Sequence, residues 1–318
     1  MCEFKNRVIT KIEREFGNEL LEILNDKLTI EIMLNSDGML WVEKLGSDMY
    51  CWGEFSEAKA KSIISSVASL LDTVANADNP ILECELPLDG SRFEALLPPV
   101  VASPTFTIRK KATKIFTLDD YVDSKIMTPK QKELIEKAII DRSNILVVGG
   151  TGTGKTTLSN ALIEGISTAT PDHRVVIIED TAELQCSSKN KVILRATEKV
   201  SMLRLLKATM RLRPDRIVVG ETRGGEALDL LKAWNTGHPG GVATIHANSA
   251  YGGLTRLEQL ISEASNAPMG ELIAEAINIV IFIAKTSSGR EIKEIAKVLK
   301  YDKNLGKYEI EIMNKYKS

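Results

Sequence analysis

The sequence predicts an α/β protein, in which a small α+β N-terminal domain precedes a doubly wound α/β domain that ends in a β-hairpin. Its 318 residues correspond to about two compact domains. From about residue 128, short β-branched runs alternate with helical periodicities, a pattern typical of a parallel sheet covered by helices on both faces. Within that part, NILVVGGTGTGKTTL at 144–158 places a glycine-rich turn directly between such a run and a helix.

The N-terminal domain, residues 1–112, is predicted to begin with an amphipathic helix over 1–26, because Ile12, Phe16 and Leu20 share a broad apolar face. A core-packing helix is favoured over one that lies on a membrane, since its charges are mixed in sign. Alternating residues and turn sequences predict the other elements. These are a hairpin of Leu28–Leu34 and Met39–Leu45 around NSDG, a helix over Ser56–Val74, a strand pair of Leu82–Leu86 and Arg92–Leu97, and a short strand at Phe106–Arg109.

We place a linker at residues 113–127, because a strong helix start follows it. Thr128 is predicted to cap that helix, with Pro129 in its first turn and Gln131 as the capping-box partner. The alternation that follows predicts the second domain, 128–318. Its expected strands are Ile145–Val148, Val175–Ile178, Ile217–Val219, Val242–Ile245 and Ile279–Ile283, its later helices are Thr197–Leu212, Gly225–Thr236 and Ser249–Ser262, and its terminal hairpin joins Ile292–Tyr301 to Tyr308–Met313.

Composition favours a cytoplasmic protein. The apolar stretch Ile277–Ala284 is far shorter than the ~20 residues that span a bilayer, and residues 1–26 lack the apolar core of a signal peptide. The four cysteines lie far apart without a CxxC pair, so we expect reduced thiols and no zinc site.

Charge is unevenly spread. Residues 1–112 carry 12 Lys and Arg against 18 Asp and Glu, and the remainder carries 29 against 25. Solvated surface charge is the favoured reading, docking of acidic and basic faces of neighbouring subunits is the alternative, and neither part has a nucleic-acid footprint.

The glycine-rich turn is a candidate phosphate-binding loop. Gly149, Gly154, Lys155 and Thr156 satisfy GxxxxGK[ST], in which backbone N–H groups wrap phosphate and the lysine reaches the β and γ phosphates. A turn that binds nothing is disfavoured, because strand, loop, lysine, hydroxyl pair and helix follow in the required order. We expect Lys155 to be an exposed loop residue. The candidate nucleotide-binding residues are Gly149, Gly150, Thr151, Gly152, Thr153, Gly154, Lys155, Thr156 and Thr157.

Carboxylates follow two of the predicted strands. Glu179, Asp180 and Glu183 end one strand, at the edge of the sheet where ligands bind in this fold class. A carboxylate that orients water against the γ phosphate is favoured there over a solvated loop end. Glu221 ends the next strand, where nucleotide-hydrolysing sheets hold Mg²⁺. We expect Thr156 to be the direct protein ligand of Mg²⁺ and Glu221 to act through a metal-bound water.

Basic residues flank these carboxylates. Arg204, Arg211 and Arg213 crowd one predicted helix, and a charge-neutralising finger among them is the alternative to simple solvation. His238 and His246 lie at either end of a short strand. No third ligand for a metal pair is apparent, so a phosphate-sensing or interface role is favoured, in which His and Thr bond a phosphate oxygen or a carboxylate.

These motifs, in this order, resemble those of the secretion ATPase superfamily, and most closely the TrbB-like ATPases of conjugal transfer and type IV secretion. The matching segments are GGTGTGKTT, IIEDTAEL, RLRPDRIVVGETRGGEA and GHPGGVATIHANS, which correspond to the family's Walker A, Asp box, Walker B and His box. They cover about residues 144–250. Thr181 after the Asp-box aspartate favours the type IV secretion branch over pilus retraction motors, which normally carry proline there.

The resemblance implies a RecA-like ATPase domain, ATP with Mg²⁺ bound between two domains, and a homo-hexamer attached at the cytoplasmic face of the membrane to an embedded transfer channel. By motif position, Glu183 matches the general base, Glu221 the Walker B glutamate, Arg211 the arginine before RPD, and His246 the His box. Arg109 looks like the family arginine that reaches the phosphates from the N-terminal domain. Direct nucleic-acid binding is not expected.

Other readings stay open at this point. A pilus or type II secretion ATPase is one, although the four-cysteine zinc module of type II assembly ATPases has no counterpart here. A nucleotide-dependent scaffold with negligible turnover is another, and the intact set of carboxylates disfavours it. A nucleic-acid translocase on the same core is disfavoured by the acidic N-terminal domain. Sequence leaves Glu179 and Glu183 unresolved as the catalytic carboxylate.

Overall fold

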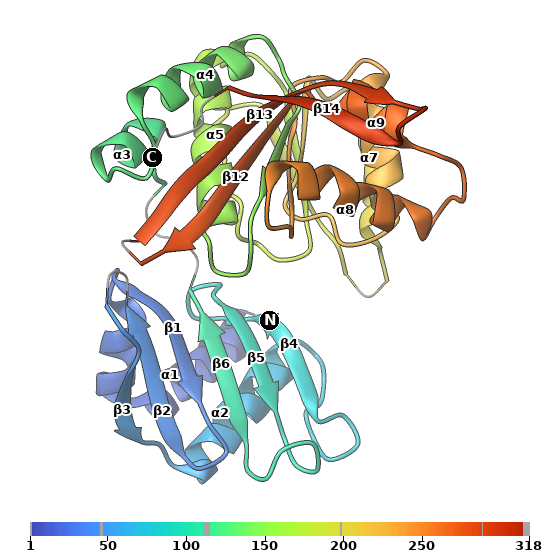
Figure 1. Cartoon of the computed structure of the whole chain (residues 1–318). Helices are drawn as coiled ribbons and strands as arrows, with labels where there is room; N and C mark the ends of the chain where they lie inside the picture. The colour runs from blue at the N-terminus through green and yellow to red at the C-terminus, as the bar shows by residue number, and fades with distance from the viewer. Residues whose placement is uncertain (1, 45–46, 111–114, 198, 288, 314–318) are drawn as a thin grey trace. The chain divides into compact units, whose positions relative to one another are not determined.

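The computed structural model describes residues 2–44, 47–110, 115–197, 199–287 and 289–313 (Figure 1). It divides the chain into two compact units, residues 1–113 and 114–318, which are described in turn. Leu45 and the first residues of the predicted linker, 113–114, lie outside the described residues.

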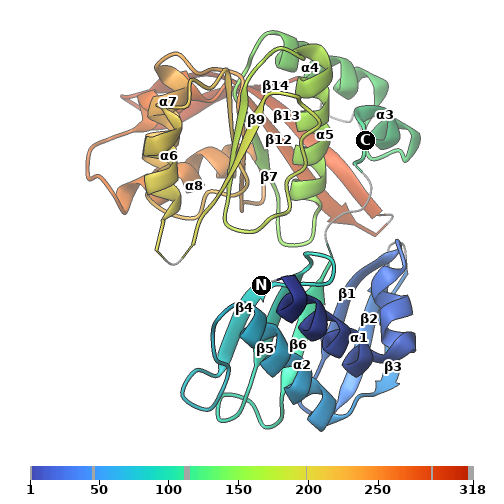
Figure 2. The same ribbon diagram turned by 180° about the vertical axis from the view of Figure 1, so that it is seen from behind.

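The first unit is an antiparallel sheet with two helices on one face. The helices lie behind the sheet in Figure 1 and in front of it in Figure 2. The sheet order is β3-β2-β1-β6-β5-β4. Phe106 lies at the centre of the core, with its ring near those of Phe16, Phe55 and Phe93. The elements are α1 (Cys2–Asn25), β1 (Thr29–Leu34), β2 (Met39–Lys44), β3 (Tyr50–Glu54), α2 (Glu57–Leu70), β4 (Ile81–Glu85), β5 (Arg92–Leu96) and β6 (Thr105–Arg109).

The predicted elements of this unit are present, and two features were not foreseen. Gly17, with φ of 72°, interrupts the helical geometry of α1, so the predicted single helix bends there. Strand β3 pairs with β2 at the edge of the sheet. The alternation of apolar and polar residues in β3 is weak because none of its residues is buried, and Gly53 adds no side chain to the pattern.

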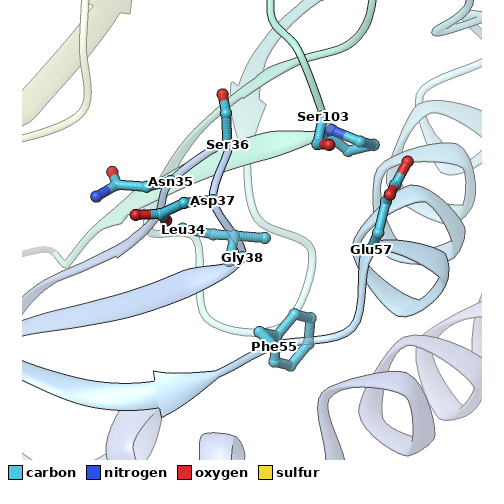
Figure 3. Close-up of a pocket in the computed structure, with 9 residues that line it drawn as sticks. Leu34, Asn35, Ser36, Asp37, Gly38, Phe55, Glu57 and Ser103 are labelled. Carbon is cyan, nitrogen blue, oxygen red and sulfur yellow. The ribbon is translucent and has the colours of Figure 1, made fainter.

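A small pocket of about 180 Å³ lies in the first unit, beside the turn that joins β1 to β2 (Figure 3). Asp37 and Glu57 make its polar lining acidic, and Phe55 closes its base. None of its lining residues belongs to the predicted site. The lining comprises Leu34, Asn35, Ser36, Asp37, Gly38, Phe55, Glu57, Ser103 and Pro104.

The second unit is an eight-stranded sheet between two helical layers. The sheet order is β14-β13-β12-β7-β11-β10-β8-β9, and the strands from β12 to β9 run parallel. The elements are α3 (Leu118–Asp123), α4 (Pro129–Ile140), β7 (Ile145–Val148), α5 (Lys155–Ala169), β8 (Val175–Glu179), β9 (Lys191–Arg195), α6 (Met202–Thr209), β10 (Arg216–Val219), α7 (Glu226–Asn235), β11 (Val242–Ile245), α8 (Ala250–Ser262), α9 (Gly270–Ala276), β12 (Ile279–Thr286), β13 (Gly289–Asp302) and β14 (Lys307–Ile312).

Each face of this sheet has its own core. Helices α3, α4 and α5 pack on one face, and α6, α7, α8 and α9 pack on the other. The four central strands are buried along their whole length, as a parallel sheet covered on both faces requires. The predicted doubly wound class and the terminal hairpin are confirmed. Within the described residues, no helix is both long enough and apolar enough to cross a bilayer.

The second unit departs from prediction in three places. The predicted linker contains α3, whose N-cap Thr117 forms a capping box with Asp120. Lys191–Arg195 is an edge strand, and the helix expected over 197–212 is shorter, because Thr197 and Val200 close a turn and Ser201 caps α6. Helix α9 is only seven residues long and lacks an N-cap hydrogen bond from a side chain, so its start signal is weak.

Arg216, the first residue of β10, joins several segments at one edge of the sheet through its hydrogen bonds. Its guanidinium is fully buried and donates to the carbonyls of Ile139 and Gly240, 3.0 and 3.1 Å away, and to Nδ1 of His173 at 3.2 Å. Burial and the neighbouring Arg142 lower the pKa of Arg216 to about 10. A Cβ on Gly240 would lie 2.1 Å from Arg216 Nη1, so a side chain there would displace the guanidinium. The three acceptors satisfy the buried cation and tie α4, β10 and the loop before β11 together.

Candidate active site

The phosphate loop, Gly149–Thr156, lies where the buried strand β7 meets α5. Gly154 caps α5 with a positive φ of 96°, a conformation that favours glycine. Gly149 packs so closely on β12 that a Cβ would lie 2.6 Å from the carbonyl oxygen of Ile283. Packing against β12 therefore fixes the position of the loop. The loop leads directly into the N-terminus of α5, where the backbone N–H groups and the helix dipole favour an anion.

Lys155 lies folded against this loop. Its ammonium donates to the carbonyls of Gly149 and Gly150, at 3.1 and 3.0 Å, and lies 3.2 Å from Nδ1 of His246. Only 8% of the residue is exposed. The expectation of an exposed lysine is wrong, because the loop curls over the start of α5 and encloses the side chain. Its charge is thereby concentrated at the centre of the loop.

Glu179, the last residue of β8, shapes the segment that follows it. One carboxylate oxygen accepts the backbone N–H groups of Glu183 and Leu184, at 3.0 and 2.9 Å. The residue is 2% exposed, and burial raises the pKa of its carboxyl group above the ordinary value. Asn160 of α5 holds the same segment from the other side, through the carbonyl of Glu183 and the N–H of Gln185. Glu179 is thus bound to the protein backbone.

Glu183 points at the phosphate loop as a result. Its Oε2 accepts a hydrogen bond from the hydroxyl of Thr156 at 3.2 Å. The Thr156 hydroxyl oxygen is a ligand of the kind that Mg²⁺ prefers, so this corner of the site fits the ion. In the described part of the chain, no group of three or more His, Cys, Asp and Glu side chains could hold a metal. A magnesium ion here would therefore depend on phosphate and water oxygens for most of its ligands, as is usual in nucleotide sites.

Glu221 follows β10 and has a basic side chain beside each of its two carboxylate oxygens. Arg223 approaches Oε2 with Nε at 2.7 Å and Nη2 at 2.5 Å. His246 Nε2 lies 2.6 Å from Oε1, although that oxygen lacks a hydrogen bond of good alignment. The side chain is 14% exposed.

His246 connects Glu221 to Lys155. An ammonium has only protons to donate, so Nδ1 accepts from Lys155 and the ring proton resides on Nε2, facing Glu221. Burial and the charge of Lys155 lower the pKa of His246, against the opposing effect of Glu221. The imidazole is therefore neutral near neutral pH, and it completes a chain from the phosphate loop to the carboxylate that ends β10.

Several predicted residues are not brought into this group. Arg204, Arg211 and Arg213 are exposed, and Arg211 and Arg213 directly precede β10, so these two lie toward the edge of the sheet opposite the phosphate loop. Among the described residues, Arg211 has no hydrogen bond or ion pair with that loop. His238 contacts the carbonyl of Pro214 at 2.9 Å, also at the opposite edge. Arg109 belongs to the first unit, where it is the exposed last residue of β6.

Comparison with known proteins places the chain in a family. The model of the family described as "Type II/IV secretion system protein" matches residues 15–300. The chain belongs to this family.

Relatives within the type II/IV secretion family include proteins of conjugation. The chain is 52% identical to the probable conjugal transfer protein TrbB of Sinorhizobium fredii, over 96% of this chain and 93% of that one. It is 51% identical to conjugal transfer protein TrbB of Rhizobium radiobacter, over 94% and 92%. The crystal structure of the ATPase DotB of Legionella pneumophila shares the fold, with a TM-score of 0.64 and 20% identity over 91% of this chain and 82% of DotB. The resemblance stated from the motifs is confirmed.

Two arginines of this family member belong to the site and had no predicted role. Arg223 lies two residues beyond Glu221 in the Walker B segment, so the sequence places the two residues near each other. Spacing along a loop does not show that their side chains are in contact. Arg290 of β13 packs over the phosphate loop, with Nη2 3.4 Å from the carbonyl of Gly152. It is 138 residues away in sequence, and only the pairing of β12 with both β7 and β13 brings it there.

Proposed function

We propose that this protein is the ATP-hydrolysing motor of a conjugative type IV secretion channel. The chain is an ATPase of the type II/IV secretion family, and the conjugal relatives support the choice of system. The observation that carries the proposal is the convergence of Lys155, Thr156, Glu183 and Glu221 from three separate segments at one edge of the parallel sheet. Ligands bind at this edge in doubly wound folds.

The proposed roles follow from these contacts. The amides of the phosphate loop and the Lys155 ammonium bind the β and γ phosphates. Lys155 then exchanges its carbonyl and His246 partners for phosphate oxygens. Glu183 accepts the proton of the attacking water, because its carboxylate is held beside Thr156 by the backbone. Thr156 would hold Mg²⁺ together with water ligands, and the ion would supply neutralisation of the charge that develops on the phosphates.

Glu221 and His246 form the second part of the proposed site. Glu221 would hold Mg²⁺ through an intervening water, and His246 connects Glu221 to Lys155. Glu179 has a different task, because an oxygen that already accepts two backbone N–H groups is poorly placed to act as a base. The geometry therefore supports Glu183 over Glu179 as the catalytic carboxylate.

Assembly is the remaining part of the proposal. Arg211 lies away from the phosphate loop of its own chain, so its proposed role as a charge-neutralising finger requires a neighbouring copy. A homo-hexamer at the cytoplasmic face of the membrane, in contact with embedded channel proteins, would supply that neighbour. Arg109 would reach the phosphates from the N-terminal domain of this assembly.

The direct test is phosphate release by the purified full-length chain. We expect steady turnover of ATP with Mg²⁺, its loss on chelation with EDTA, and no change on adding DNA. Tight binding of ATP without phosphate release would favour a nucleotide-dependent scaffold. Strong stimulation by DNA would favour a translocase.

A separate prediction concerns Arg109 and its neighbour Lys110. Arg109→Ala is expected to lower kcat by roughly tenfold or more with a smaller effect on nucleotide affinity, because a mobile guanidinium that neutralises the transition state couples closure to chemistry. Arg109 is exposed, so the thermal midpoint should not change. Lys110→Ala is the matched control, since its ammonium is bound to the carbonyl of Asp26 at 2.8 Å. Equal, small effects of the two variants on kcat would make Arg109 an ordinary surface residue.

A further inference from the structure

Arg223 joins two of the motifs that carry the proposed chemistry. Its Nη1 lies 2.6 Å from Oδ2 of Asp180 in the Asp box, while Nε and Nη2 hold Oε2 of Glu221 at 2.7 and 2.5 Å. One guanidinium thus bridges a carboxylate after β8 and a carboxylate after β10. Asp180 lies three residues before Glu183 on the same segment, so the bridge connects the supports of both proposed catalytic carboxylates.

The loop that carries Arg223 is itself tied down. Glu226, at the start of α7, accepts the N–H groups of Arg223 and Gly224 on one oxygen, at 2.8 and 3.0 Å. The N–H of Thr222 donates to the carbonyl of Thr244 in β11 at 2.9 Å. A Cβ on Gly225 would lie 2.8 Å from that of Ala264, so the loop also packs closely at its far end. The backbone from which the Arg223 side chain extends is therefore fixed.

Stability alone does not account for this bridge. The Arg223 side chain is 59% exposed and that of Asp180 is 38% exposed. Ion pairs with this exposure typically contribute little to stability, because water screens the charges and ordering a long side chain costs entropy. The bridge instead gives geometric restraint, since the planar fork of a guanidinium can hold two carboxylates at a fixed separation and angle.

We propose that Arg223 is a positioning residue that keeps Glu183 and Glu221 in a fixed relation, through its simultaneous pairing with Asp180 and Glu221. This inference rests on the proposed function, because it assigns a task within the same site. With Arg223 in place, the Asp-box segment and the Glu221 loop move as one body. Without it, the Asp-box segment and the Glu221 loop lose the side-chain link between them, and the site spends less time in the geometry that hydrolysis requires.

The test compares three variants of the full-length protein by kinetics and nucleotide binding. Arg223→Ala is expected to lower kcat by roughly tenfold or more, while the KM for ATP changes less than about threefold, because the guanidinium acts on the reacting geometry and not on ground-state binding. Arg223→Lys should recover only part of kcat, since an ammonium is a point charge that cannot hold both carboxylates as a fork does. Arg256→Ala removes an exposed arginine on α8 and should retain wild-type kinetics.

A double-mutant cycle isolates the bridge itself. Asp180→Asn is expected to lower kcat in the wild-type background and to cost little more when Arg223 is already alanine, because the two residues act as one unit. Additive losses would overturn the proposal, as would a raised KM with unchanged kcat, which would mean that Arg223 contacts the nucleotide. A fall in the thermal midpoint that accounts for the lost activity would assign Arg223 to folding.

Failure of this inference can be told apart from failure of the proposed function. If the wild-type chain releases no phosphate, the ATPase assignment itself falls. If the wild type is active and Arg223→Ala retains its kcat to within about twofold, the site stands and only the positioning role is lost.

Discussion

Replacing Lys155 with alanine is expected to abolish ATP turnover. The ammonium is held at the centre of the phosphate loop by the carbonyls of Gly149 and Gly150, within 3.2 Å of His246. A cation at this point neutralises charge on the β and γ phosphates, and electrostatic stabilisation of this kind supplies most of the catalysis in phosphoryl transfer. Loss of the charge removes both the phosphate contact and the link to His246. Phosphate release measured at saturating ATP checks this expectation.

The fold should survive this change. The partners of Lys155 are loop carbonyls and a half-exposed histidine, so alanine opens no gap in the cores that flank the sheet. Lys130→Ala is the matched control, because Lys130 is an exposed lysine at the start of α4. We expect both variants to unfold near the wild-type temperature and only Lys155→Ala to lose activity. Hydrolysis by Lys155→Ala near the wild-type rate would refute the assignment of the loop.

Glu183→Gln is expected to bind Mg-ATP and to turn it over about 10²- to 10⁴-fold more slowly, the range typical for loss of a positioned general base. Glutamine preserves the hydrogen bond from Thr156, made at 3.2 Å, so the position of the side chain is maintained while its basicity is lost. Single-turnover phosphate release separates the slow chemical step from nucleotide binding.

Glu179→Gln and Glu221→Gln are the comparisons for that variant. Glu179→Gln keeps an oxygen that can accept the N–H groups of Glu183 and Leu184, so its effect on kcat should be smaller. Glu221→Gln should also weaken the dependence of turnover on Mg²⁺ concentration. Normal hydrolysis by Glu183→Gln would transfer the catalytic role to Glu179.

Local signals account for what could be predicted from the sequence. The strand before Gly149, the loop and the start of α5 are contiguous, so one stretch of chain defines the central element of the site. The burial of the central strands follows from their β-branched composition. Strand β9 escaped prediction because an edge strand with charged ends shows a weak pattern, and the turn at Thr197 was absorbed into a longer helix.

Contacts between distant residues account for what could not be predicted. The choice between Glu179 and Glu183 depends on backbone bonds within their loop and on Asn160, 23 residues upstream of Glu183. The environment of Lys155 depends on His246, 91 residues away. Arg223 reaches Asp180 across 43 residues. In each case the residue type was visible in the sequence, and the partner was determined by the folded path of the loops and by the order of strands in the sheet.

The two ends of the short strand β10 are under different evolutionary constraints, because Arg216 at one end serves folding and Glu221 beyond the other end serves catalysis. Arg216 is the first residue of β10, and its hydrogen bonds join the elements at the edge of the sheet opposite the phosphate loop. Glu221, just beyond the other end of the strand, faces the phosphate loop. Substitution of Arg216 should reduce the population of folded molecules and leave the rate of each folded molecule nearly unchanged. Substitution of Glu221 should leave the population of folded molecules nearly unchanged and reduce the turnover rate of each folded molecule. A relative that kept the arginine and lost the glutamate would therefore be a folded protein without turnover, and its Walker B segment would still look largely intact.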